Sequence, residues 1–318
     1  MEKAILIVDD IHEVLLEKLR EAEIPFTYLP ESNKDEAEDL IAGYTGLIIR
    51  SKFQVDQSFI DKAPHLQFIA RAGAGMDNID ELYALSKGIR LLPANEGNRD
   101  AVGEHMIGML LSLMNNLNRG HHEISTGHWL REKNRGYELK GRTVALIGYG
   151  HNGQAMARKL SGFEVNVIAY DKYRTGFSDQ YAREVSMEEV VKQADVLSFH
   201  IPLTRETTGL VDKEYLYHFR KPIFFLMGAR GGIVDIPAVL YYLDQGKILG
   251  AAFDVLPIEK FPALQQQDWY NELISRDNVL MSPHVAGWTF ESYYKLSAVL
   301  ADKIIADGEK DEQKRVQR

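Results

Sequence analysis

An arginine, two carboxylates and a histidine follow separate strand-like runs late in the chain. Arg230, Asp254 and His284 each lie at or just after the end of a different apolar run, and Glu259 lies five residues beyond Asp254. If these runs are parallel strands, the residues converge on one edge of a sheet, where α/β proteins bind ligands. Histidine exchanges protons near neutral pH, and arginine holds anions. The set suits hydride chemistry on a hydroxyl or carbonyl group.

A glycine-rich turn supplies the signature of a dinucleotide. The apolar run 144–147 leads into Gly148-Tyr149-Gly150-His151-Asn152-Gly153, and an alanine-rich helical pattern follows. Gly148 permits a tight turn, Gly150 lets a pyrophosphate approach the backbone, and Gly153 lets helix and strand pack closely. A second apolar run ends in Asp171, near the spacing expected for a carboxylate that holds a ribose hydroxyl.

Composition excludes several classes of function. The chain has 318 residues, a net charge of -9 and no cysteine. The acidic balance argues against non-specific nucleic-acid binding, and without cysteine there are no disulfides, thiol nucleophiles or thiolate metal sites. No apolar run reaches the length of a membrane span, and the N-terminus resembles a strand more than a signal peptide. We therefore expect a cytoplasmic protein with no membrane partner and no metal.

Strand-like and helical stretches alternate through the chain, which predicts an α/β fold of two doubly wound parallel sheets. The first small domain covers residues 1–96, joined by a C-terminal helical stretch (286–318) that could pack back on it. Residues 97–285 form the second domain. After Asn98, a long apolar helical pattern predicts a core helix that could also serve as a subunit interface.

The chain resembles the D-isomer-specific 2-hydroxy acid dehydrogenase family over about residues 45 to 290. The similar motifs are residues 70–80, 97–105, 148–153, 200–207, 229–231, 252–255 with Glu259, and 283–284. The resemblance implies an NAD-dependent dehydrogenase, with a Rossmann NAD-binding domain and a flavodoxin-like substrate domain.

The resemblance also implies roles for His284, Glu259 and Arg230. His284 is expected to be the acid/base, with Glu259 pairing with it and raising its pKa. Arg230 is expected to bind the substrate carboxylate and 2-oxygen. The remaining substrate contacts are expected from the backbone of Ala74 and Gly75 and from Asn98.

The cofactor is expected to be NAD, because the carboxylate of Asp171 would repel the 2′-phosphate of NADP. Lys172 and Arg174 nearby leave that preference open. Asp254 is expected to hold the nicotinamide carboxamide. The other residues expected to contact the cofactor are Val102, Gly148, Gly150, His151, Asn152, Gly153, His200, Pro202, Thr207, Ala229 and Gly287.

Within the family, three arginines resemble phosphate contacts of the branch that oxidises 3-phosphoglycerate in serine biosynthesis. They are Arg50, Arg71 and Arg131, and they predict a local positive pocket. The chain would be a short form without a regulatory domain. A glyoxylate/hydroxypyruvate or D-lactate type reductase is the alternative, and an NAD-sensing corepressor is an alternative of another class.

Three residues depart from the family pattern. Asn152 replaces isoleucine, Gly228 replaces asparagine, and Lys260 replaces proline after the glutamate. None removes a catalytic group, although Lys260 could disturb Glu259. We expect a homodimer formed through the helix at 100–118.

Overall fold

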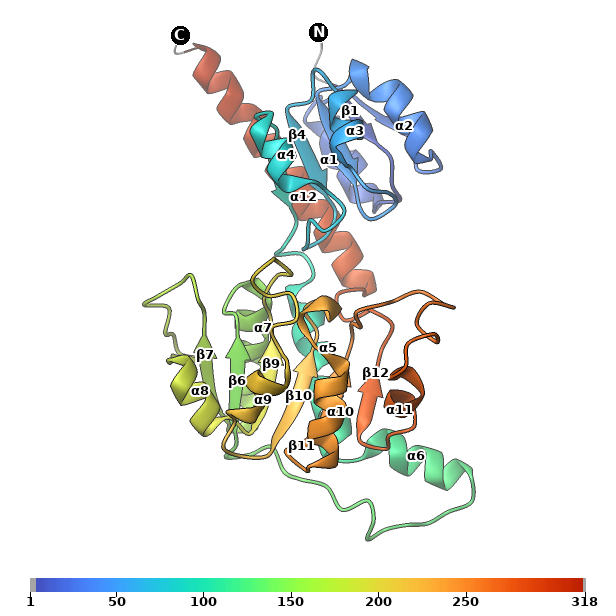
Figure 1. The fold of residues 1–318 in the computed structure, drawn as a ribbon. Helices are drawn as coiled ribbons and strands as arrows, with labels where there is room; N and C mark the ends of the chain where they lie inside the picture. The colour runs from blue at the N-terminus through green and yellow to red at the C-terminus, as the bar shows by residue number, and fades with distance from the viewer. Residues whose placement is uncertain (1–3, 317–318) are drawn as a thin grey trace. The chain divides into compact units, whose positions relative to one another are not determined.

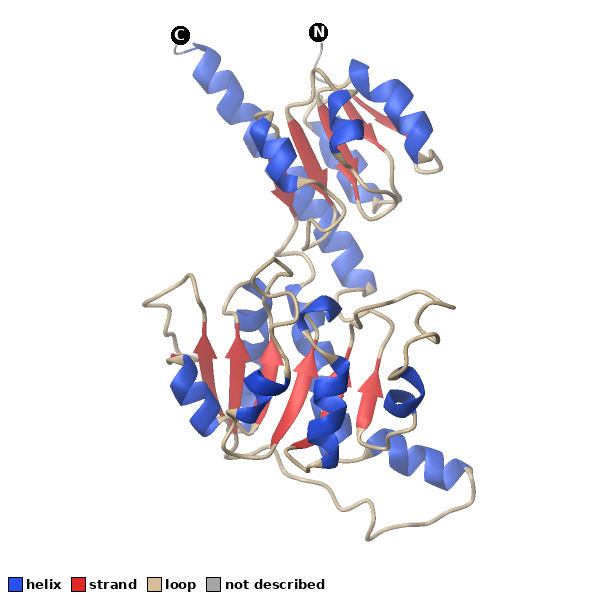
Figure 2. Cartoon of the chain, viewed as in Figure 1, coloured by secondary structure: helices blue, strands red, loops and turns tan. Residues whose placement is uncertain are grey.

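The computed structural model describes residues 4–316, and the side chains among them up to residue 308. The chain divides into two compact units, which Figure 1 colours along the chain and Figure 2 colours by secondary structure. Unit 1 comprises the residues up to 98 together with those from 288 on, and unit 2 comprises residues 99–287.

Unit 1 is a five-stranded parallel sheet with helices. Its strands are β1 (Ile5–Ile7), β2 (Phe26–Tyr28), β3 (Gly46–Ile49), β4 (Phe68–Arg71) and β5 (Arg90–Pro93). Its helices are α1 (Glu13–Glu21), α2 (Lys34–Leu40), α3 (Gln57–Asp61), α4 (Glu81–Ser86) and α12 (Phe290–Val316), with a 3-10 turn at Ile41–Gly43. The strand order β2-β1-β3-β4-β5 is the doubly wound order of flavodoxin-like folds.

Unit 2 is a seven-stranded parallel sheet with helices. Its strands are β6 (Thr143–Ile147), β7 (Asn166–Tyr170), β8 (Arg183–Glu184), β9 (Val196–Phe199), β10 (Ile223–Met227), β11 (Ile248–Phe253) and β12 (Val279–Met281). Its helices are α5 (Arg99–Met114), α6 (Leu117–Ser125), α7 (His151–Leu160), α8 (Met187–Gln193), α9 (Lys213–Tyr217), α10 (Ile236–Asp244) and α11 (Tyr270–Ile274), with 3-10 turns at Ser161–Phe163 and Gly231–Ile233.

The strand order of unit 2 is β12-β11-β10-β9-β6-β7-β8. If the strands are numbered from β6 and the order is read from the β8 edge, it becomes 3-2-1-4-5-6-7. The first six strands therefore have the Rossmann order, and β12 adds one further strand at the edge. Two parallel doubly wound sheets are what the alternating sequence pattern predicts, so the predicted fold class is confirmed.

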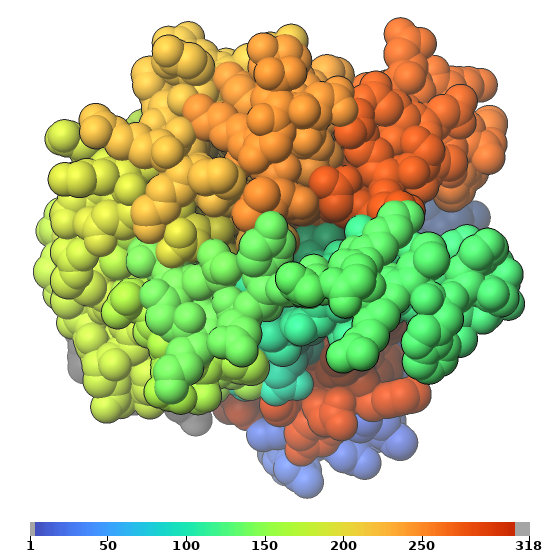
Figure 3. Space-filling view, turned by 90° about the horizontal axis from the view of Figure 1, so that it is seen from below, coloured from blue at the N-terminus to red at the C-terminus, as the bar shows by residue number. Residues whose placement is uncertain are grey.

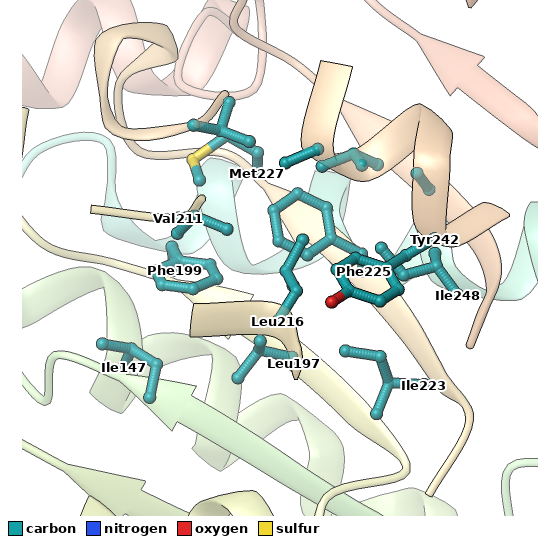
Figure 4. Close-up of a cluster of buried hydrophobic side chains, with 14 of the residues drawn as sticks. Ile147, Leu197, Phe199, Val211, Leu216, Ile223, Phe225, Met227, Tyr242 and Ile248 are labelled. Carbon is teal, nitrogen blue, oxygen red and sulfur yellow. The ribbon is translucent and has the colours of Figure 1, made fainter. Parts of the chain in front are cut away.

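Each face of the unit 2 sheet has its own hydrophobic core because successive side chains of a strand point to opposite faces. In β6, Ala145 and Ile147 join one core, whereas Val144 and Leu146 join the other. Figure 4 shows the first of these cores, where Phe225 lies among side chains from neighbouring strands and helices. Burial on both faces explains why these strands are almost continuously apolar.

The long helical pattern after Asn98 is two helices. Asn116 adopts the left-handed conformation (φ 53°), which asparagine tolerates better than most residues, and there α5 gives way to α6. Most apolar side chains of α5 are buried in the core of unit 2, with Met106 and Leu110 fully covered. The apolar face that predicted a subunit interface is therefore covered within the chain itself.

Within residues 4–316, no helix is both long and apolar enough to cross a membrane. Among the described side chains, which extend to residue 308, there is no group of three or more histidine, cysteine or acidic residues placed to bind a metal ion.

Candidate active site

The carboxyl edge of the unit 2 sheet carries most of the residues singled out by sequence. The glycine-rich turn follows β6, His200 follows β9, Arg230 follows β10, Asp254 follows β11 and His284 follows β12. Because all these strands are parallel, their ends lie along one edge of the sheet, as the arrowheads in Figure 2 show. This edge is where doubly wound folds bind ligands.

His284 and Glu259 form a pair on this edge. Nδ1 of His284 lies 2.8 Å from Oε2 of Glu259, although Lys260 follows the glutamate in place of proline. The hydrogen bond to Glu259 raises the pKa of His284, burial opposes this effect, and the positive charge of Arg230 also lowers the pKa. Because Glu259 engages Nδ1, Nε2 is the ring nitrogen that can exchange a proton with a substrate.

The main chain of His284 is held in an unusual conformation by Asp254. His284 has φ 55°, a left-handed value that is strained for a residue with a side chain. Its N–H donates to the carbonyl oxygen of Asp254 at 2.8 Å. The buried carboxylate of Asp254 accepts from Ser282 Oγ at 2.6 Å and from the N–H groups of Val285 and Ala286 at 2.9 and 3.0 Å.

Asp254 therefore has a structural task that sequence reasoning missed. Its carboxylate accepts three hydrogen bonds from the segment that carries His284, and the residue is only 2% exposed. A contact between Asp254 and the nicotinamide carboxamide stays a prediction.

Arg230 begins the turn after β10 with an extended backbone, and its Nη1 donates to the carbonyl oxygen of Ala229 at 2.7 Å. Glycine is required next, because a Cβ at Gly231 would lie 1.9 Å from the backbone carbonyl carbon of Leu256. A Cβ at Gly228 would lie 2.3 Å from the sulfur of Met106. The family pattern has asparagine at position 228. In this chain Met106 fills the space that the asparagine side chain would occupy.

The glycine-rich turn fits a pyrophosphate. A Cβ at Gly148 would lie 2.6 Å from the carbonyl oxygen of His200, and Gly148 has φ 93°. A Cβ at Gly153 would lie 2.3 Å from the carbonyl oxygen of Gly148, whereas nothing described lies within 4 Å of a Cβ at Gly150. The first and third glycines allow tight packing, and the second leaves open space at the N-terminus of α7, where anions bind.

A cavity of about 350 Å³ adjoins this turn. It is lined by Ile147, Gly148, Gly150, Tyr170, Asp171, Lys172, Tyr173, Met187, His200, Ile201, Pro202, Thr204, Glu206, Thr207, Leu210 and Tyr215. The pyrophosphate turn, a carboxylate at a strand end and an apolar wall suit the adenosine half of a dinucleotide.

The two cations next to Asp171 are engaged by the protein. Lys172 Nζ lies 2.5 Å from Glu206 Oε2, and Arg174 donates to the carbonyl oxygen of Tyr149. Asp171 itself accepts from the N–H groups of Tyr149 and Tyr173 at 2.9 and 3.0 Å. A 2′-phosphate would meet this carboxylate and Glu206, so the pocket favours NAD over NADP.

The other residues predicted to contact the cofactor lie in different environments. Burial lowers the pKa of His200 to about 4, so its ring is neutral, and its Nε2 lies 3.0 Å from Ser198 Oγ. Asn152, in the first turn of α7, has a buried Oδ1 without a hydrogen-bond partner among the described residues. Val102 is buried in the core, and His151 is exposed. Ala229 lies in the turn after β10, and Gly287 lies in the loop between β12 and α12.

In unit 1, Arg71 points into the loop that follows β4. Its Nε donates to the carbonyl oxygen of Arg50 and to Asn78 Oδ1, both at 2.8 Å, and its Nη1 donates to the carbonyl oxygen of Gly75. Arg71 therefore shapes the loop that presents the backbone of Ala74 and Gly75, a role that sequence reasoning did not foresee.

Arg50 is the substrate-binding candidate whose side chain lies against an aromatic ring. Its guanidinium carbon lies 4.5 Å from the centre of the Trp288 ring, and its Nη1 is buried without a hydrogen-bond partner among the described residues. The carboxylate of Asp9 accepts from the N–H groups of Arg50, Ser51 and Lys52 at 3.0, 2.8 and 2.9 Å. The turn that carries Arg50 is thus fixed. Asn98 is the last residue of the first segment of unit 1, and its Oδ1 is buried without a hydrogen-bond partner among the described residues.

Arg131 is not brought to the edge that carries Arg230. It lies in the arm, which we define as residues 126–142, between α6 and β6. In the arm, the Tyr137 ring packs against Phe224 near the start of β10, and Lys133 pairs with Asp277 just before β12. The arm therefore follows the amino-terminal edge of the sheet, as Figure 1 shows, whereas His284 follows the carboxyl end of β12.

The effect of Glu259 on the pKa of His284 can be tested by measuring how activity depends on pH. In Glu259→Gln, His284 loses the partner that raises its pKa, so the pKa should fall. Oxidation needs the neutral base, so its kcat/KM should rise at lower pH than in the wild type, with kcat reduced roughly tenfold. The reductive direction needs the protonated ring, so its activity is lost as the pH rises. In the variant this loss should occur at lower pH than in the wild type.

The matched control for this measurement is Glu272→Gln, which removes another exposed glutamate paired with a cation in unit 2. Identical pH profiles for Glu259→Gln and the wild type would contradict the assigned role of Glu259.

Residues 107–286 match the NAD binding domain of the D-isomer specific 2-hydroxyacid dehydrogenases. The chain belongs to this family, and NAD is the cofactor that its matched domain binds.

Two relatives show how far the similarity extends. The chain is 31% identical to a D-3-phosphoglycerate dehydrogenase of Archaeoglobus fulgidus, over 95% of this chain but only 56% of that protein. It is also 31% identical to a hydroxypyruvate reductase of Thermotoga maritima, over 92% of this chain and 93% of that protein. The chain therefore spans little more than half of the first relative and nearly all of the second.

Solved structures show the same fold. The D-lactate dehydrogenase of Aquifex aeolicus, complexed with NAD and lactic acid, matches with a TM-score of 0.81 and 23% identity over 97% of this chain and 96% of that one. The TT0316 protein of Thermus thermophilus matches with a TM-score of 0.79 and 27% identity, over 96% and 97%.

Proposed function

We propose that this protein interconverts a D-2-hydroxy acid and its 2-oxo acid, with NAD as hydride carrier. The observation that carries the proposal is the hydrogen-bonded pair of Glu259 and His284 on the same sheet edge as Arg230. Hydride transfer to a carbonyl requires a proton donor and a cation that holds the substrate. His284, with its raised pKa, and the guanidinium of Arg230 supply these two groups.

Three residues of unit 2 would have separate roles in the reaction. Arg230 binds the substrate carboxylate and 2-oxygen through its planar fork. His284 takes the hydroxyl proton at Nε2 during oxidation and returns it during reduction, while Glu259 stabilises the protonated ring. Bound NAD supplies the hydride acceptor or donor. A corepressor would not need this acid/base pair, so the set favours an enzyme.

For the substrate, 3-phosphoglycerate is the first candidate, which would give the protein a role in serine biosynthesis. Arg50 supports it, because a buried guanidinium nitrogen without a partner among the described residues can donate a hydrogen bond to a phosphate oxygen. The similarity to the Archaeoglobus fulgidus enzyme supports it as well.

Unphosphorylated hydroxypyruvate or glyoxylate is the second candidate, and two observations favour it. Arg71 already donates to its own loop through Nε and Nη1, and the arm that carries Arg131 follows the amino-terminal edge of the sheet, so both are less suited than Arg50 to bind a phosphate. The Thermotoga maritima relative also matches over nearly its whole length.

The Arg50→Ala variant distinguishes the candidates. If the substrate is phosphorylated, kcat/KM for 3-phosphoglycerate should fall about a hundredfold, since a charge-assisted contact contributes about 1.5–3 kcal/mol, while turnover of glyoxylate changes less than about twofold. The matched control is Arg20→Ala, which removes another arginine lying over an aromatic ring. An equal, small effect on both substrates would argue for an unphosphorylated substrate. A wild-type protein that turned over no 2-hydroxy or 2-oxo acid would refute the proposed function.

We also propose a homodimer formed through α6 and the arm rather than through α5. Leu117 and Ile124 of α6 are 58% and 57% exposed, and Trp129 of the arm is 80% exposed. Figure 3 shows this segment (green) at the surface of unit 2. Exposed apolar side chains gathered on one segment are typical of a contact surface. In such a dimer, Arg131 could act only in the site of the second copy.

Charge inserted at this surface tests the dimer. Ile124→Glu should give a monomer at micromolar concentration by light scattering, because a carboxylate would have to be buried in the interface. Leu82→Glu, at a 79% exposed position of unit 1, should leave the mass unchanged. A wild-type protein that is monomeric under the same conditions would refute the dimer.

A further inference from the structure

The side chain of His105, in α5, contacts the loop that carries His284. Its Nε2 lies 2.9 Å from Ser282 Oγ and 3.6 Å from Asp254 Oδ1, although 177 residues separate His105 from Ser282. The side chain is 29% exposed, so it is largely enclosed. The mechanism proposed above makes no use of it.

The distances determine the direction of the hydrogen bonds. Ser282 Oγ lies 2.6 Å from Asp254 Oδ1, and a carboxylate only accepts, so the hydroxyl proton of Ser282 points to Asp254. The serine oxygen is then an acceptor towards His105, whose Nε2 must carry a proton. Met109 Sδ, at 3.7 Å from the same hydroxyl, is too weak an acceptor to compete with the carboxylate.

The hydrogen bonds of Asp254 hold the main-chain segment on both sides of His284. Asp254 is bound by Ser282 before the catalytic histidine and by Val285 and Ala286 after it. The left-handed conformation of His284 persists only if its surroundings enforce it. Ser282 contributes one of these anchors, and His105 fixes the orientation of Ser282.

We propose that His105 is a positioning residue: by donating to Ser282, it holds the Ser282–Asp254 contact that aims the His284 imidazole at Glu259 and the substrate. The turnover part of the test rests on the proposed function, and the titration part does not.

The experiment compares His105→Leu, His105→Gln and Ser282→Ala. NMR titration of the His284 ring, with and without NADH, needs no substrate. In His105→Leu and Ser282→Ala the pKa of His284 should fall, because a misaimed ring loses its bond to Glu259. In His105→Gln the amide N–H replaces Nε2–H and should restore the wild-type titration.

Turnover supplies the second measure. His105→Leu should lower kcat about ten- to a hundredfold, as expected for a displaced catalytic group, with the affinity for NADH changed less than about twofold. The double variant His105→Leu/Ser282→Ala should lose little more than either single variant, because both act on one contact.

An unchanged His284 titration in His105→Leu would overturn the proposal, even if stability fell. Failure of His105→Gln to restore the titration, in a folded protein, would overturn it too. If the titrations behave as expected but no 2-hydroxy acid is turned over, the positioning role stands and the proposed function fails.

Discussion

Replacing His284 by alanine should reduce kcat for 2-hydroxy acid oxidation by about 10²- to 10⁴-fold, the usual contribution of a positioned general acid/base. The affinity for NADH should stay within about twofold, because the glycine-rich turn and the Asp171 pocket do not involve this ring. Stopped-flow turnover and fluorescence titration of NADH measure the two quantities separately.

The exposure of His284 offers a further check. Its side chain is 48% exposed, so added imidazole can enter the space left in His284→Ala and should restore part of the turnover. His65→Ala, which removes an exposed histidine of unit 1, serves as the control and should behave as the wild type. Full turnover in His284→Ala would refute the proposed mechanism and favour a binding protein.

The second large effect is expected at Arg230. In Arg230→Lys, kcat/KM for every 2-hydroxy acid should fall about 10²- to 10³-fold, the range seen when a donor to a developing oxyanion is lost. The charge is kept, but an ammonium group cannot reproduce the two parallel hydrogen bonds of a guanidinium. Steady-state kinetics on a phosphorylated and an unphosphorylated acid should show the same loss, since Arg230 is assigned to the part that both share.

Arg276→Lys is the matched control, because Arg276 also belongs to unit 2 and pairs with Asp244 and Glu272. It should leave kcat/KM unchanged and reduce only stability. A loss confined to the phosphorylated acid in Arg230→Lys would mean that Arg230 binds the phosphate rather than the 2-hydroxy acid group.

The sequence by itself determined the fold class and the location of the chemistry. Apolar runs of four to six residues alternate with helical patterns, and parallel strands covered on both faces are the structure that buries them. The glycines at 148, 150 and 153 satisfy steric needs that are local to one strand–turn–helix unit, so their spacing identifies the turn. Residues at the ends of parallel strands share an edge, which is why Arg230 and His284 could be placed together in advance.

Only the tertiary structure decided what individual side chains contact. Arg71 matches a motif for substrate binding, yet its hydrogen bonds go to Arg50, Gly75 and Asn78. Arg131 lies in the arm, where Lys133 pairs with Asp277 at the amino-terminal edge of the sheet. Such choices depend on side-chain direction and on loop paths, which spacing along the chain does not record.

The contacts around Asp254 show the same limit at the catalytic loop. Asp254, Ser282 and His105 come from a strand end, a loop and a helix up to 177 residues apart. Each pattern taken alone is compatible with an ordinary core or surface residue. A buried carboxylate requires donors, and folding brings these donors from distant segments, so the network that holds His284 exists only once α5 has packed against β11 and β12.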